Sequence, residues 1–113
     1  MNIQPHGMLE THPSALFPLP AGDYAHVLVR DHCNAPAYVP GDVLLVNLAI
    51  RRFVADGLYV VEHAGQQKIR YLRDDGSLRM VCGSHPTVAI TVTADNCHVL
   101  GMVESAAKVR RVG

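Results

Sequence analysis

The sequence predicts an all-β fold of coiled antiparallel sheets with little helix. Val, Ile and Tyr gather in short runs that are separated by Gly, Asp, Asn and Pro, as in chains made of many short strands. These runs recur about every 8–12 residues, a spacing that is typical of barrels and coiled sheets. Helical periodicity is poor, and only residues 48–54 could hold a turn or two of helix. We therefore expect a barrel-like architecture built from strands.

Eight runs have the composition of strands. They alternate or cluster β-branched and aromatic residues and end at turn-forming residues. The expected strands cover residues 24–29, 43–47, 58–62, 67–72, 78–82, 87–93, 98–103 and 107–112.

Four short segments mark the turns between these strands. Gly supplies positive φ angles and Asp caps turns with its own side chain, so Asp-Gly pairs are strong hairpin signals. The turns are expected at Pro40–Asp42, Asp56–Gly57, His63–Gly65 and Asp74–Gly76.

The first 22 residues differ from the rest of the chain. They contain four of the seven prolines, and proline removes backbone donors and fixes φ. We therefore divide the chain into an extended arm, residues 1–22, and a β domain, residues 23–113. Leu16, Phe17 and Leu19 could pack on the domain or on a second subunit, although a partly ordered terminus explains the arm equally well.

The bulk composition excludes several classes of protein. The chain has 113 residues, of which 10 are basic and 10 acidic, so it suits one neutral domain. Gripping nucleic acid needs clustered cations, and stacking on bases needs aromatic side chains. This sequence has no basic excess and no Trp, so we expect no direct nucleic-acid binding. No apolar run approaches the roughly 20 residues of a membrane helix, so no membrane association is expected.

Cysteine usage indicates a reducing compartment. Cys33, Cys82 and Cys97 form an odd and sparse set, which does not make a disulfide framework. The start of the chain also lacks the basic and apolar regions of a signal peptide, so we expect a cytoplasmic protein.

Histidines next to these cysteines raise the alternative of a zinc site. Cys82 and His85 are spaced C-x-x-H, Cys97 precedes His98, and Cys33 could converge with the first pair. A second pair with metal-ligand spacing is missing, so the expectation is no metal and no cofactor.

Seven blocks carry a resemblance between Asp31 and Val103. In order they are Asp31–Pro36, Val39–Val46, Asp56–Val61, Ile69–Leu72, Leu78–Val81, His85–Pro86 and Leu100–Val103. In this order the chain resembles the C-terminal domain of LexA, UmuD and lambda-type phage repressors. These are self-cleaving serine peptidases that share their fold with signal peptidases. The resemblance covers about two-thirds of the chain and implies a LexA/signal-peptidase-like β-clip.

The resemblance also implies a degenerate catalytic dyad. Family members attack with a serine whose proton is taken by a neutral lysine, because a hydroxyl is a poor nucleophile without a base. Cys33 occupies the serine position and Arg70 the lysine position. Arginine keeps its proton in proteins, so Arg70 cannot be the base. A two-residue shift in register would place Lys68 there instead.

The substrate cleft of the family maps onto five residues around these positions. They are His32, Asn34, Pro36, His85 and Pro86. A cation such as Arg70 would favour the thiolate of Cys33, and His32 or His85 could protonate a leaving amine. An active Cys33 is therefore one reading, and a small buried thiol without chemistry is the other.

The expected function follows from these departures. A LexA/UmuD-like domain without the Ser–Lys dyad suits a catalytically inert homodimer, or a binding partner for a related repressor or a DNA polymerase. That implies phage-type or SOS-type regulation of transcription or of a polymerase. The alternative is a peptidase that cleaves itself or a partner through Cys33. Ala21–Gly22 resembles the family's cleavage bond, but it lies close to the expected first strand of the domain and suits a turn better.

Overall fold

The chain forms one open antiparallel sheet of eight strands. The structure, a computed structural model, describes residues 9–10 and 22–108. The strand order is β1-β2-β3-β8-β4-β5-β6-β7, so β1 and β7 are the two edges. The strands are β1 (Leu9–Glu10), β2 (Tyr24–Leu28), β3 (Val43–Asn47), β4 (Gly57–His63), β5 (Gln66–Asp74), β6 (Leu78–Val81), β7 (Ala89–Thr91) and β8 (Cys97–Ala107). The all-β class is confirmed, although the edges do not meet and the sheet is not a closed barrel.

Local sequence signals located most strands but misjudged the last part of the chain. The predicted strand at residues 43–47 coincides with β3, while residues 87–93 contribute only the three residues of β7. Residues 98–103 belong to a single long strand that runs on to Ala107, and no helix forms at 48–54. The packing expected for Leu16, Phe17 and Leu19 lies outside the described residues. In the described ranges, no helix is long and apolar enough to cross a membrane.

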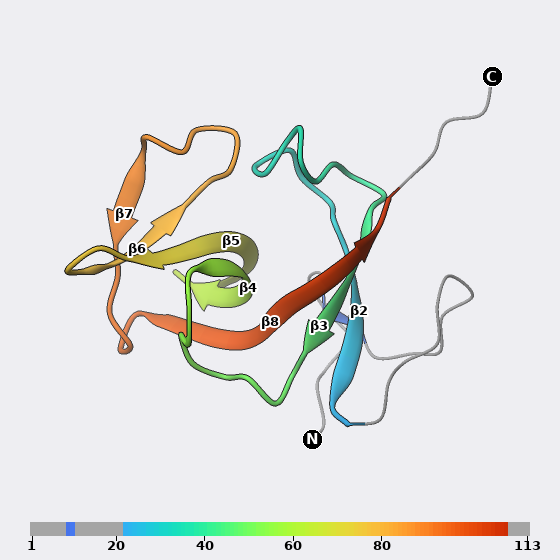
Figure 1. Cartoon of the computed structure of the whole chain (residues 1–113), viewed down its shortest axis with the longest axis horizontal. Coiled ribbons are helices and arrows are strands. Elements are labelled where there is room, and N and C mark those ends of the chain that lie inside the picture. Colours follow the sequence, from blue (N-terminus) through green and yellow to red (C-terminus); the bar gives the residue numbers. More distant parts are fainter. Residues whose placement is uncertain (1–8, 11–21, 109–113) are drawn as a thin grey trace.

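Strand β8 belongs to both halves of the sheet (Figure 1). Its first half pairs with β4 and its second half pairs with β3. The register with β4 shifts between Val60 and Val61, and the register with β3 shifts between Leu45 and Val46. Such bulges bend a strand and increase its twist. They account for the curved path by which β8 carries the sheet from β4 to β3.

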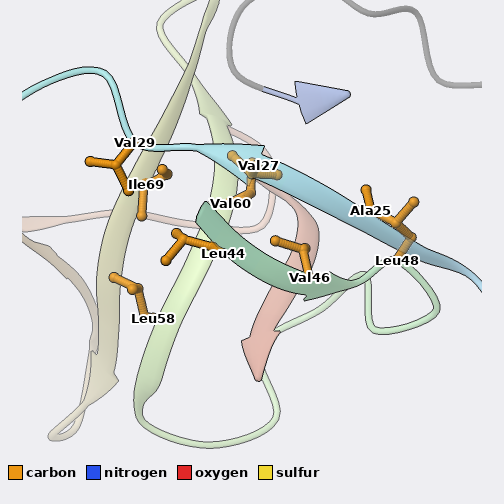
Figure 2. Packing of buried hydrophobic residues seen from close by; sticks show 9 residues of the cluster. All are labelled: Ala25, Val27, Val29, Leu44, Val46, Leu48, Leu58, Val60 and Ile69. Carbon is orange, nitrogen blue, oxygen red and sulfur yellow. The ribbon is translucent and has the colours of Figure 1, made fainter. Parts of the chain in front are cut away.

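Strand β4 is buried on both faces, which explains its continuous apolar sequence. Val60 belongs to a cluster of nine buried residues, drawn in Figure 2, which come from β2 to β5 and from the segments that directly follow β2 and β3. Tyr59 and Val61 point the other way, into a second cluster with β5, β6 and the start of β8. All three side chains are fully buried. A strand with two buried faces loses the alternation of apolar and polar residues that a half-exposed strand shows.

Gly101 lies where β8 passes closest to β3. A Cβ atom built there would lie 2.4 Å from Val46 Cγ1 and 3.0 Å from the Asn47 carbonyl oxygen. Real Cβ atoms do not approach other heavy atoms that closely. The bend of β8 therefore depends on the absence of a side chain at this position.

Replacing Gly101 with alanine should destabilise the protein by about 1–3 kcal/mol, because the new methyl group overpacks the core. The free energy of unfolding can be measured by denaturant titration. Gly57→Ala is the matched control, because its Cβ would meet Met102 Cε only at 3.4 Å. Equal stability of the two variants would contradict the role given to Gly101.

Candidate functional site

The residues of the predicted site lie mainly on the segment that joins β2 to β3. This segment, residues 29–42, is closed at its base by two backbone hydrogen bonds. The N–H of Val29 donates to the Asp42 carbonyl oxygen at 2.8 Å, and the N–H of Gly41 donates to the Val29 carbonyl oxygen at 3.0 Å. The segment is therefore a loop whose ends are held together, with Cys33 and its neighbours at its far part.

A disulfide joins Cys33 on this loop to Cys82 at the end of β6. The two Cα atoms lie 5.4 Å apart although the residues are separated by 49 positions. Both residues are half-buried. The odd and sparse set of cysteines did not predict this bond, because cysteine count and spacing do not show which segments the sheet brings together.

Asn34, the residue after Cys33, bridges the loop to β5 and to the turn that follows β6. Its Nδ2 donates to the Ile69 carbonyl oxygen at 2.8 Å, and its Oδ1 accepts from the N–H of Gly83 at 2.9 Å. Its side chain is buried, so both bonds are made away from water. Gly83 permits this contact, because a Cβ there would lie 3.2 Å from Asn34 Cα and 2.9 Å from Tyr71 Cε2. Asn34 thus has a structural role beside the cleft to which it was assigned.

Arg70 on β5 contacts the same loop by an ion pair with Asp31. Its Nη1 lies 3.9 Å from Asp31 Oδ2 and donates to the Ile69 carbonyl oxygen at 2.8 Å. The other oxygen of Asp31 accepts from the N–H of Cys33 at 3.1 Å. Burial lowers the pKa of Arg70 and the charge of Asp31 opposes this, but a guanidinium stays protonated in proteins. Asp31 thus connects the two positions that were expected to form the dyad.

Both lysines of the chain are engaged elsewhere. The Nζ of Lys68 lies 3.2 Å from His63 Nδ1, near the turn between β4 and β5. Lys108 forms an ion pair with the fully buried carboxylate of Asp42 and donates to the carbonyl oxygen of Ala37. Its ammonium also lies 4.9 Å from the centre of the Tyr38 ring. These contacts give neither ammonium group the position of a base for Cys33.

The hydroxyl of Ser84 connects Cys82 to His85. Its Oγ lies 3.6 Å from Cys82 Sγ and 2.9 Å from His85 Nδ1. The backbone N–H of Ser84 also donates to the Cys33 carbonyl oxygen at 2.8 Å. His85 was predicted as a site residue and Ser84 was not, because a single serine after a strand carries no pattern of its own. His32, the residue before Cys33, is exposed.

A groove of about 390 Å³ lies beside this group. Three residues assigned to the cleft, Asn34, Pro36 and Pro86, line it together with Tyr71 and Arg73. Cys33, His32, Arg70 and His85 are not among its lining residues. The structure therefore separates the predicted site into a groove and, next to it, the disulfide with its polar neighbours.

The zinc hypothesis requires cysteine and histidine side chains that lie close enough together to bind a metal ion. In residues 9–10 and 22–108, no three His, Cys, Asp or Glu side chains are placed to hold a metal ion. Cys33 and Cys82 bond to each other. Cys97 is a buried free thiol, and burial raises its pKa while the charge of Lys68 opposes the rise.

Comparison with known proteins yields no relative: neither a protein-family model nor a curated protein matches this sequence.

Asn34→Ala should lower the free energy of unfolding by about 2–3 kcal/mol, because it leaves the buried N–H of Gly83 without its acceptor. Asn96→Ala is the matched control. Its Oδ1 accepts from the N–H of Thr93 at 2.9 Å in an exposed turn, where water can replace it. Thermal and denaturant unfolding check the difference, and equal losses in the two variants would contradict the bridging role of Asn34.

Proposed function

We propose that this chain is a catalytically inert association domain, similar to the LexA and UmuD C-terminal domains, that acts as a homodimer in phage-type or SOS-type regulation. The observation that supports it most is the state of the position where the family has its nucleophile. There the sulfur of Cys33 is bonded to Cys82. A disulfide sulfur has no lone thiolate with which to attack a peptide bond.

The position of the base supports the same proposal. Serine-lysine and related dyads need a group that accepts a proton near neutral pH. Arg70 is ion-paired with Asp31 and cannot serve. Lys68 and Lys108, the two lysines, contact His63 and Asp42 instead. Because none of these three side chains can act as the base, we propose that the domain works by association with another chain.

The edge strand β7 offers a surface for association. Among the residues that the structure describes, it pairs only with β6, so its other side is available to pair with another strand. Ile90 on β7 and Val88, which directly precedes this strand, are large apolar side chains that are 51% and 63% exposed. The segment from Ser84 to Thr93 contains no Asp, Glu, Lys or Arg, the charged residues that commonly protect an edge.

A second copy of the chain is the occupant that fits this edge. Two copies of β7 can pair antiparallel across a two-fold axis, so that each presents the same short apolar strand to the other. Main-chain hydrogen bonds then supply affinity and the exposed valine and isoleucine supply apolar contact. A strand of a related repressor or of a DNA polymerase could use the same edge.

Val88→Lys with Ile90→Lys should convert the protein from dimer to monomer, because two charges would be placed on the paired edge. Light scattering at about 50 µM, a concentration at which a micromolar dimer is mostly assembled, measures the mass. Val54→Lys is the control, since Val54 is 44% exposed but lies outside β7. A wild-type monomer would contradict the proposal, and a dimer that survives the double substitution would move the interface away from β7.

Cleavage through Cys33 is the second candidate function. One observation favours it: the half-buried Cys33 donates its backbone N–H to the Asp31 carboxylate that faces Arg70, so reduction would leave a thiol on a residue that contacts this ion pair. The inert proposal expects an intact chain after incubation with a reductant at raised pH, as measured by mass spectrometry. A fragment that disappears in Cys33→Ala and persists in Cys97→Ala would contradict inertness and establish the thiol peptidase.

A further inference from the structure

The surroundings of the Cys33–Cys82 disulfide differ on its two sides. The sulfur of Cys82 lies 3.6 Å from the hydroxyl oxygen of Ser84. That oxygen in turn lies 2.9 Å from His85 Nδ1. Cys33 has the carboxylate of Asp31 on its backbone N–H and the exposed His32 beside it. Among the described residues, only the sulfur of Cys82 is therefore connected through a hydroxyl, that of Ser84, to an exposed imidazole, that of His85.

From this asymmetry we propose that Cys33–Cys82 is a redox site that exchanges with small or protein dithiols, with Cys33 as the sulfur attacked and Cys82 as the leaving group. His85 protonates the departing sulfur through Ser84. The inference does not depend on the β7 edge that is proposed for association, but it concerns the same Cys33–Cys82 bond that supports the absence of peptidase activity.

The exchange balances in two steps. A thiolate of the reductant attacks Cys33 Sγ, which forms a mixed disulfide and breaks the bond to Cys82. The electron pair of that bond goes to Cys82 Sγ, which takes the hydroxyl proton of Ser84 while Ser84 takes the Nδ1 proton of His85. The second thiol of the reductant then displaces Cys33. The protein disulfide is reduced to two thiols and the dithiol is oxidised to a disulfide.

The reduced state has a partner for the new thiol. Cys82 Sγ lies 2.7 Å from the carbonyl oxygen of Cys33, which can accept its proton once the disulfide is broken. An acceptor of this kind favours the neutral thiol over the thiolate. The carbonyl oxygen therefore stabilises Cys82 as the protonated product of the exchange, and the choice of Cys82 as the leaving sulfur rests on its contacts with Ser84 and His85.

The fold does not depend on the disulfide alone. The loop is also bound to the strands by Asn34, through Ile69 and Gly83, and by the hydrogen bond from Ser84 N–H to the Cys33 carbonyl oxygen. These bonds need no oxidation. A crosslink that duplicates other contacts can open and close without unfolding the domain, which a redox site requires.

The test measures reduction of the full chain. After oxidation with glutathione disulfide, alkylation in denaturant should label one thiol, that of Cys97. Reduction by dithiothreitol at about pH 6.5 is then followed by acid quench, alkylation and mass spectrometry. Ser84→Ala and His85→Gln should each slow it about fivefold to tenfold, because the leaving sulfur loses its proton donor. His32→Gln, which alters the histidine next to the other sulfur, is the control and should match the wild type.

Trapping with reduced glutathione tests the direction of attack. Trypsin places Cys33 in the peptide of residues 31–51 and Cys82 together with Cys97 in that of residues 80–108, so the peptide mass locates glutathione on Cys33 and fragmentation separates Cys82 from Cys97. Glutathione on Cys33, and a circular dichroism spectrum unchanged by reduction, support the proposal. It is overturned if three thiols label before reduction, if the relay variants react like His32→Gln, if glutathione is found on Cys82, or if reduction unfolds the domain.

Discussion

The close approach of β8 to β3 at Gly101 is the constraint on which the rest of the structure depends. At this point β8 leaves the side of β4 and joins the side of β3, and any side chain would collide with Val46. The bulges on either side allow the strand to turn without losing its pairing. Because one strand completes both halves of the sheet, the β2–β3 loop and the β5–β6 strands come to lie against each other. The candidate site exists only through that arrangement.

At the site, contacts within the protein occupy the groups that would do peptidase chemistry. The sulfur of Cys33 is bonded to Cys82, the guanidinium of Arg70 faces Asp31, and the amide of Asn34 is used on both ends. Each contact lowers the freedom of a group that a catalyst would need to present to a substrate. The result is a junction of bonded side chains next to an open groove.

The sequence predicted what depends on neighbouring residues and failed where distant segments decide. Strand β3 could be located because its apolar run follows a Pro-Gly-Asp turn. The expected strand at 98–103 ended too early because Glu104 and Ser105 interrupt the apolar pattern of β8 at the bulge opposite Leu45, where pairing is irregular. The expected strand at 107–112 lies almost entirely outside the described residues. Cys33 and Arg70 were placed near each other by family resemblance. The disulfide and the contacts of Ser84 depend on strand order and on distances, which composition and spacing do not contain.

The double burial of β4 has a consequence for the cooperativity of the molecule. Its side chains divide between the two apolar clusters, and its backbone is paired with β5 on one side and β8 on the other. Local opening of either half therefore has to disturb the strand that supports the other half. A domain whose two cores share one central strand has no subdomain boundary between them, so both cores melt in a single transition.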